Sequence, residues 1–384
     1  MMSSKPVLAS LLILAALVPA TAGAIETKAR SAMAVDHDTG MVLLQKNAQE
    51  PLPTASMSKL MTLYMLFEAI REERVTTETE FRVSQRAQSM GGSRMFVEAG
   101  TVVPVDALIH GIIVQSGNDA CVVVAENLAG TEEEFARQMT VRAKELGLNN
   151  TSLKNASGWP EPGHEMSAED LVKLAQLIIT EFPEYYGYFA ETEYTWNDIT
   201  QQNRNPLLDL GIGADGLKTG HTSEAGYGLV GSAVQDGQRI VFVLTGLDSA
   251  SERAAQAEAV VNWAFNSFDT VRFFDEGDEA AVADVWLGAE RTVPLVAPDD
   301  IQMLVPRAER SEVTARIVYN TPIEAPVKAG QVAGAILVDV PGHDQVKFDL
   351  VAAEDVDRGG LMTRLEAAAI ITRDRALDMI TGSD

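Results

Sequence analysis

A serine and a lysine stand three positions apart in the segment Ser56-Met57-Ser58-Lys59. In a helix, side chains at this spacing lie on the same face. A serine hydroxyl is a weak nucleophile until a neighbouring base takes its proton, and a lysine can be that base when desolvation or another cation lowers its pKa. The pair therefore predicts acyl transfer through a covalent intermediate on Ser56, with Lys59 as the base.

The residues that follow this pair predict the helix that positions it. Pro53-Thr54 comes just before the serine, and the start of a helix supplies partial positive charge and free backbone N–H groups, which favour the oxyanion of a tetrahedral intermediate. Apolar side chains then recur at helical spacing, which predicts an amphipathic helix: Leu60, Leu63, Met65, Leu66, Ala69 and Ile70.

A second polar group, Ser116-Gly117-Asn118, lies between the apolar segments 108–114 and 120–125. This arrangement predicts a sharp turn between two buried helices. A hydroxyl at such a turn can relay a proton, and an amide can hold a peptide amide of a substrate. Ser116 and Asn118 are therefore candidates for these two tasks.

The third group, Lys218-Thr219-Gly220, lies beside the alternating segment 227–234, and a turn at Asp236-Gly237 leads into a further strand at 239–244. A glycine on an edge strand lets an extended peptide lie close to the backbone. Lys218 and Thr219 can meet a carboxylate there.

With these motifs the chain resembles the low-molecular-mass penicillin-binding proteins, specifically the D-alanyl-D-alanine carboxypeptidases of the type 5 and 6 subgroup. The similarity runs from about Ile25 to the C-terminus. The longer strings around the motifs carry it: Thr54-Ala55-Ser56-Met57-Ser58-Lys59-Leu60-Met61-Thr62, Gln115-Ser116-Gly117-Asn118-Asp119-Ala120-Cys121 and Gly216-Leu217-Lys218-Thr219-Gly220-His221-Thr222.

The resemblance implies a serine-type carboxypeptidase that removes the terminal D-alanine from peptidoglycan stem pentapeptides and is acylated by β-lactam antibiotics, without a cofactor or a metal. It implies that Ser56 is the nucleophile, that Lys59 is the base, and that Ser116 and Lys218 move protons and hold charge. The implied substrate-binding residues are Asn118, Lys218, Thr219, Gly220, His221 (whose backbone N–H would join that of Ser56 in the oxyanion hole) and Arg253, which would help to position the substrate's carboxylate. Arg204 also matches a family position, and its role stays open.

Three alternatives remain on the same fold: a D,D-endopeptidase, a β-lactamase, and a non-catalytic peptidoglycan-binding scaffold. The pattern Glu145-Leu146-Gly147-Leu148-Asn149 matches the one that carries the deacylating base of class A β-lactamases. Because Gly147 ends a helical stretch, we interpret it instead as a helix C-cap with Glu145 in solvent. Labelling with fluorescent penicillin separates enzyme from scaffold, and the lifetime of the label separates a penicillin-binding protein from a β-lactamase.

The expected fold is an α/β (α+β) serine β-lactamase/D,D-peptidase-like domain over residues 25–269, with one antiparallel sheet flanked by helices. A hairpin of segments 32–36 and 42–46 and a helix over 251–268 belong to it. Residues 270–358 predict a small all-β domain. Its expected strands are 282–287, 292–296, 301–305, 313–319, 331–338 and 345–351.

The N-terminal residues predict export, and the C-terminal residues predict contact with a membrane. Residues 1–24 carry Lys5, an apolar run over 7–18 and small residues at Ala22-Gly23-Ala24, as in a secretory signal peptide cleaved after Ala24. Residues 359–384 predict an amphipathic helix, which the family uses as a membrane anchor. Since this helix has no Trp or Phe and balanced charges, we expect only weak contact with a membrane interface, on the periplasmic face of the inner membrane.

Composition narrows the partners further. The net charge of −25 argues against nucleic acid, whose phosphates such a surface repels. The five histidines form no ligand pattern in the sequence, and His164-Glu165 lacks the second histidine of a zinc helix. The one cysteine, Cys121, has no intramolecular partner, and we interpret it as a small apolar residue of a helix.

Overall fold

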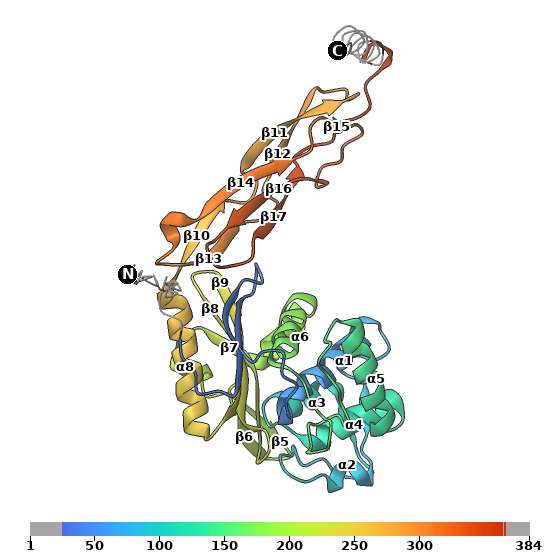
Figure 1. The fold of residues 1–384 in the computed structure, drawn as a ribbon. Helices are drawn as coiled ribbons and strands as arrows, with labels where there is room; N and C mark the ends of the chain where they lie inside the picture. The colour runs from blue at the N-terminus through green and yellow to red at the C-terminus, as the bar shows by residue number, and fades with distance from the viewer. Residues whose placement is uncertain (1–24, 364, 366–384) are drawn as a thin grey trace, which may run out of the picture.

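The computed structural model describes residues 25–363 and 365. A five-stranded antiparallel sheet lies at the centre of the first domain, in the order β2-β1-β9-β8-β7 (Figure 1). Its strands are β1 (Ser31–Asp36), β2 (Val42–Lys46), β7 (Ala214–Thr222), β8 (Gly226–Gln235) and β9 (Gln238–Leu247). The predicted hairpin and the predicted strands are confirmed, and β7 is an edge strand.

The sheet is covered on both faces because successive apolar residues of its strands point alternately into two separate cores. Helix α8 (Ala250–Ser267) packs on one face, and a group of helices packs on the other (Figure 1). On β9, Ile240, Phe242 and Leu244 pack in the core on the face that α8 covers. Val241 and Val243 pack in the core on the face that the other helices cover. The expected antiparallel sheet flanked by helices is confirmed.

The helices on the second face surround α1 (Lys59–Arg71), which the short 3-10 helix η1 (Ala55–Ser58) precedes. Helix α1 is buried on nearly all sides, with Met61, Tyr64 and Phe67 as inaccessible as Leu60, so it is a core helix rather than the amphipathic helix expected. Its neighbours are α3 (Val105–Ile113), α4 (Asn118–Ala129), α5 (Glu132–Glu145) and α6 (Ala168–Glu181).

Side-chain caps begin the long helices α5, α6 and α8, and Ser84 caps the short helix α2 (Gln85–Ser89) in the same way. The hydroxyls of Thr131, Ser167 and Ser249 accept hydrogen bonds from backbone N–H groups in the first turns of α5, α6 and α8, at 3.1, 3.0 and 3.0 Å. Each bond satisfies an N–H group that the helix itself leaves free. Shorter elements complete the domain: α2, α7 (Pro183–Tyr186), β3 (Glu80–Arg82), β4 (Val102–Pro104), β5 (Glu193–Trp196) and β6 (Ile199–Gln202).

The second domain is all-β, as expected, and extends away from the first (Figure 1). A six-stranded sheet has the order β14-β16-β17-β12-β11-β15, and β10 pairs with β13. The bounds are β10 (Phe268–Phe274), β11 (Glu279–Trp286), β12 (Thr292–Val296), β13 (Ile301–Pro306), β14 (Thr314–Tyr319), β15 (Ile323–Glu324), β16 (Val332–Asp339) and β17 (Val346–Ala352). Strands β10 and β15 were not expected from the sequence.

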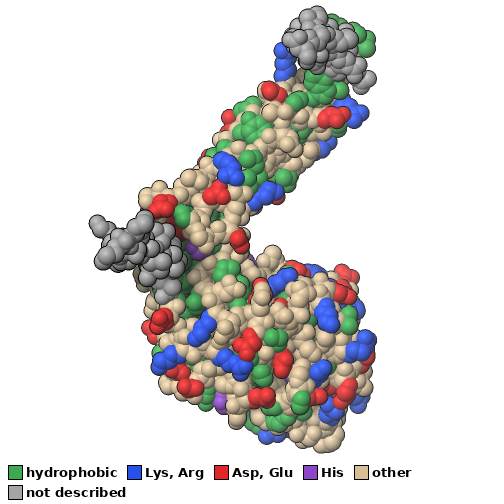
Figure 2. Space-filling view, in the orientation of Figure 1, with side chains coloured by type: hydrophobic (Ala, Val, Ile, Leu, Met, Phe, Trp, Pro, Cys, Tyr) green, Lys and Arg blue, Asp and Glu red, His purple; other side chains and the backbone are tan. Residues whose placement is uncertain are grey.

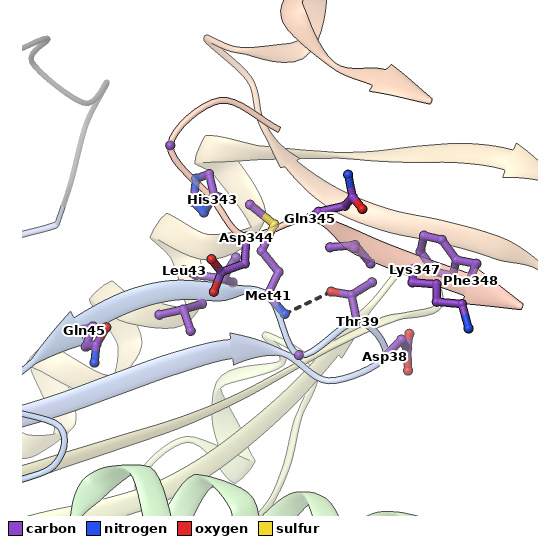
Figure 3. Close-up of a pocket in the computed structure, with 14 residues that line it drawn as sticks. Asp38, Thr39, Met41, Leu43, Gln45, His343, Asp344, Gln345, Lys347 and Phe348 are labelled. Atoms are coloured by element: carbon purple, nitrogen blue, oxygen red, sulfur yellow. Dashed lines mark hydrogen bonds between the residues drawn. The ribbon is translucent and has the colours of Figure 1, made fainter. Parts of the chain in front are cut away.

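The tip of the β1–β2 hairpin joins the two domains. Met41 is buried in the core of the second domain, and Thr39 Oγ1 accepts a hydrogen bond from its N–H at 3.2 Å. A groove of about 510 Å³ lies between this hairpin and the loop that leads into β17 (Figure 3). At the end of β1, the buried carboxylate of Asp36 accepts a hydrogen bond from the Leu304 N–H of β13 at 3.1 Å.

Charged side chains of both signs and hydrophobic side chains are scattered over the visible faces of both domains (Figure 2). Among the helices that the structure describes, none is both long and apolar enough to cross a membrane. The predicted signal peptide and most of the predicted C-terminal helix lie outside the described residues. Of that helix, residues 361–363 and 365 are described and helical.

Candidate active site

Ser56 lies on η1, one turn before Lys59 at the start of α1. Lys59 Nζ donates hydrogen bonds to Ser56 Oγ at 2.8 Å, to Asn118 Oδ1 at 2.7 Å, and to the carbonyl oxygen of Ser157. The lysine side chain is completely buried. The expected pair on one face is therefore a direct contact between the candidate nucleophile and the candidate base.

The surroundings of Lys59 suit an amine that loses its proton. Burial lowers its pKa to about 8, and Arg204 adds a like charge. An ammonium has three N–H donors, and three acceptors surround this one. When the proton leaves, the two carbonyl oxygens can keep the remaining two N–H groups, so that the lone pair points at Ser56 Oγ.

The segment from Ser116 to Asn118 forms the expected turn between α3 and α4. Ser116 adopts a positive φ of 57° and is buried, which brings its hydroxyl within 2.9 Å of Lys218 Nζ. Burial, followed by the like charges of Lys59 and Arg204, lowers the pKa of Lys218 well below its usual value. Two buried lysines thus lie in one site, each in contact with a serine hydroxyl.

Strand β7 carries Lys218, Thr219 and Gly220 along the edge of the sheet, next to η1. Gly220 makes this approach possible, because a Cβ atom there would lie 2.6 Å from the Thr54 carbonyl oxygen and 3.0 Å from Met57 Cγ. Thr219 and Lys218 are buried. The edge strand and the nucleophile turn therefore form adjacent walls of the site.

Two arginines lie close to the end of this strand. Arg253 Nη2 is 3.4 Å from the Arg204 carbonyl oxygen, and its guanidinium carbon lies 5.8 Å from the centre of the Tyr227 ring. That ring also stacks on His221 at 3.8 Å. Burial lowers the pKa of both arginines. With the two lysines they give this region an excess of positive charge, which suits a substrate carboxylate.

Sequence reasoning missed several groups that hold the site together. Asn118 Nδ2 donates to the Gly91 carbonyl oxygen at 2.9 Å, and Asn118 N–H donates to that of Ser93 at 2.8 Å, so the segment 91–94 is tied to the site. The indole of Trp159, 45% exposed, packs on Gly91, where a Cβ atom would lie 3.1 Å from it. From the sequence, Gly91-Gly92-Ser93-Arg94 fits a mobile loop near the site and a plain turn equally well, and the hydrogen bonds to Asn118 place it at the site.

The Ser157 carbonyl, which contacts Lys59, was also missed. The side chain of Asn155 shapes this loop by accepting hydrogen bonds from Gly158 N–H at 2.8 Å and Trp159 N–H at 3.0 Å. Asparagine commonly organises a turn in this way. The segment Asn155-Ala156-Ser157-Gly158 is typical of a turn, but the residue types do not indicate which carbonyl faces Lys59.

Two residues that the sequence raised are placed outside the chemistry. Glu145 ends α5, is exposed and pairs with Arg142 at 3.1 Å, in keeping with the C-cap interpretation. Cys121 is buried on α4, and burial raises the pKa of its thiol to about 12, so it stays protonated. Within residues 25–363 and 365, no three His, Cys, Asp or Glu side chains gather as metal ligands would.

Comparison with protein families matches residues 18–249 to the peptidase S11 family, D-alanyl-D-alanine carboxypeptidase. Residues 268–358 match the family described as penicillin-binding protein 5, C-terminal domain. D-alanyl-D-alanine carboxypeptidase DacD of Escherichia coli is 36% identical over 348 residues, which cover 88% of this chain and 90% of that protein.

Solved structures agree with these matches. Penicillin-binding protein 5 from Haemophilus influenzae has a TM-score of 0.77 and 32% identity, and the similarity covers 87% of this chain and 99% of that chain. Penicillin-binding protein D2 from Listeria monocytogenes, solved in an ampicillin-bound form, has a TM-score of 0.57 and 26% identity, over 62% of this chain and 97% of that chain. The chain therefore belongs to the D-alanyl-D-alanine carboxypeptidase family, with a penicillin-binding protein 5 C-terminal domain after the first domain.

Proposed function

We propose that this protein is a serine-type D-Ala-D-Ala carboxypeptidase that removes the terminal D-alanine from peptidoglycan stem pentapeptides through an acyl-enzyme on Ser56. The observation that carries the proposal is the contact between Ser56 Oγ and a buried lysine amine whose other two hydrogens have carbonyl acceptors. A lysine held in this way is an effective general base near neutral pH.

The reaction proceeds in two balanced steps. Ser56 Oγ attacks the penultimate D-alanine carbonyl carbon while Lys59 takes the hydroxyl proton. The tetrahedral oxyanion is held by the backbone N–H groups of Ser56 and His221. The peptide C–N bond then breaks, the leaving amine receives a proton through Ser116, and D-alanine departs. In the second step, water attacks the ester carbonyl carbon and gives a proton to the base. The acyl C–Oγ bond then breaks, Ser56 Oγ takes up a proton from the base, and the shortened peptide leaves.

Substrate recognition uses the edge strand and the positive charge around it. The stem peptide lies extended along β7, with Asn118 on a peptide amide. Lys218, Thr219 and Arg253 bind the terminal carboxylate, and Gly220 leaves room for the backbone.

Penicillins act on the same serine. A β-lactam presents a strained amide and a carboxylate, so it acylates Ser56 as the peptide does and then remains attached. The related protein from Listeria monocytogenes was solved with ampicillin bound. Acylation of this chain by a β-lactam follows from the same site geometry.

We also propose that the enzyme is exported and works at the periplasmic face of the inner membrane, with weak contact through the C-terminal helix. Support comes from the apolar run over 7–18 and from the amphipathic pattern over 361–380. Removing residues from Gly360 onward should leave catalysis unchanged and release the mature enzyme from vesicles. Equal partition of both forms would overturn the membrane contact.

A release assay separates the proposed activity from its alternatives. The wild type should liberate D-alanine from a stem pentapeptide faster than it cleaves a cross-linked dimer, and the Ser56→Ala variant should do neither. Faster cleavage of the dimer would indicate an endopeptidase. Rapid loss of a penicillin label would indicate a β-lactamase, and no labelling would indicate a scaffold.

A further inference from the structure

His164 is a buried histidine, 4% exposed, whose ring joins the loop between α5 and α6 to the 3-10 turn η1. Its Nδ1 accepts a hydrogen bond from the Lys154 N–H at 3.1 Å, so the ring proton resides on Nε2. Nε2 lies 2.9 Å from Ser58 Oγ and donates to it. Ser58 Oγ in turn donates to the Ala55 carbonyl oxygen at 3.0 Å. The three bonds therefore run in one direction, toward the residue before Ser56.

This series of hydrogen bonds ends at Ala55, whose backbone is strained. Ala55 adopts a φ of +49°, a backbone conformation that residues with a Cβ atom rarely take and that the surroundings must hold in place. Gly158 packs against the same carbonyl, where a Cβ atom would lie 1.9 Å from the Ala55 oxygen and 2.8 Å from Ser58 Oγ. The Ala55 carbonyl is thus fixed between Gly158 and the Ser58 hydroxyl.

The loop that carries His164 also contacts the base, since the Ser157 carbonyl oxygen accepts from Lys59. One loop therefore holds both members of the nucleophile pair: Lys59 directly, and the Ser56 turn through His164. Burial, with the charge of Lys59, lowers the pKa of His164 to about 4, so the ring is neutral when the enzyme works. A protonated ring would lose its Nδ1 acceptor and add a further cation near Lys59.

We propose that His164 is a positioning residue for the nucleophile: by donating to Ser58 it holds the 3-10 turn in the orientation that directs Ser56 Oγ at Lys59. This inference rests on the proposed acyl transfer at Ser56. His164 does not take part in the proton transfers itself, because both of its ring nitrogens are engaged within the protein. A misplacement of about 1 Å in a reacting group can cost about 10²-fold in rate, so the loss of this hydrogen bond is measurable.

The test compares two substitutions of the histidine. His164→Phe fills a similar volume without a donor, whereas His164→Gln keeps an N–H donor for Ser58. We measure the rate constant for acylation by a fluorescent penicillin, together with kcat and KM for D-alanine release, on protein counted by active-site titration. His164→Phe should lower acylation and kcat by about 10–100-fold with little change in KM, and His164→Gln should recover to within about threefold of the wild type.

A double-substitution cycle with Ser58→Ala tests the route. Ser58→Ala should lower acylation as His164→Phe does, and the two together should be no worse than either alone, because both break the same chain. Ser58→Ala changes little volume, so it also tests the proposal if His164→Phe does not fold. His343→Phe, in the second domain, is the matched control and should acylate normally.

Three results would overturn the proposal: wild-type acylation by folded His164→Phe, equal losses in the Phe and Gln variants, or losses that multiply in the double variant. The last would show that His164 does not act through Ser58. Failure of the proposed function looks different, because the wild type itself would then carry no penicillin on Ser56.

Discussion

Lys59 Nζ lies 2.8 Å from Ser56 Oγ, and the other two acceptors around the amine are carbonyl oxygens of Asn118 and Ser157. Neither carbonyl oxygen carries a proton that it could donate to the amine. The protonation state of Lys59 therefore depends on burial and on the nearby cations. The pKa of about 8 that results leaves about one tenth of the molecules with a neutral Lys59 at pH 7.

The acylation rate should therefore depend on pH. With the neutral amine of Lys59 as the proposed base, the rate constant for penicillin acylation should rise from pH 6 and level off above about pH 8. Stopped-flow measurements across this range check the profile. Lys59→Arg, whose side chain keeps its proton, should lower acylation by several orders of magnitude, and a flat wild-type profile would contradict the assignment of Lys59 as base.

Substitution of Arg253 should separate carboxylate binding from the chemistry. Arg253→Ala removes a cation but leaves the hydrogen bonds of Ser56 and Lys218 in place. We expect a loss of about 10–100-fold in kcat/KM for D-alanine release, and a smaller loss in acylation by a reactive penicillin. Equal losses on both substrates would instead assign Arg253 to the fold or to the general charge of the site.

The contact between β7 and η1 predicts the effect of a single methyl group. Gly220→Ala would place a Cβ atom 2.6 Å from the Thr54 carbonyl oxygen, so the strand must move away from the nucleophile turn. We expect acylation to fall by about 10²-fold in a protein that remains folded, as judged by circular dichroism. Gly187→Ala, where no atom lies within 4 Å, is the control. Normal acylation by Gly220→Ala would show that this approach is not critical.

The domain junction should make stability depend on pH. Desolvation is the main cause that raises the pKa of Asp36 to about 6, although the Leu304 N–H bond opposes it. The folded protein then binds this proton more tightly than the unfolded chain, so the free energy of unfolding should fall as the pH rises from about 4 to 6. Above pH 6 the free energy of unfolding should be lower than at pH 4 by on the order of 1–3 kcal/mol.

Asp36→Asn tests that dependence, because an amide oxygen can still accept from Leu304 N–H without carrying charge. At pH 7.5 the Tm of the variant should be higher than that of the wild type. At pH 4.5 this difference should be smaller or reversed. Asp344→Asn, at an exposed position of the neighbouring groove, should show no such difference. An unchanged pH dependence in Asp36→Asn would mean that another group titrates.

The strands of the central sheet could be predicted because their signals are local. Alternating residues and the turn at Asp236-Gly237, where both residues have positive φ, mark β8 and β9. Strand β10 could not be predicted in this way. It follows α8 without a break, at Phe268, and its pairing with β13 runs from Phe268–Pro306 to Phe274–Ile301, between residues far apart in the sequence.

The orientation of helices was harder to predict than their existence. Helix α8 has alanines on all its faces, and the structure buries Ala257 and Ala264 while Ala255 and Ala259 are exposed. Apolar periodicity cannot choose between such faces. In α1 the pattern suggested one polar side, but Glu68 pairs with Arg142 at 2.6 Å within the packed helices.

Within the site, the side chains named by motifs lie together, but the backbone groups that support them were not predictable. The carbonyl oxygens of Ser157 and Gly91 contact Lys59 and Asn118 through loop conformation, which residue type does not specify. Likewise, His164 has no motif, and only its burial and its contact with Ser58 reveal a role.

The most direct test of this account is to locate the penicillin. After reaction with a β-lactam, mass spectrometry of the digested protein should show one antibiotic adduct, on the peptide that contains Ser56. The Ser56→Ala variant should carry none, whereas Ser58→Ala should still be labelled, more slowly, at Ser56. A full adduct on Ser56→Ala, or an adduct on any other residue of the wild type, would contradict Ser56 as the acylated nucleophile.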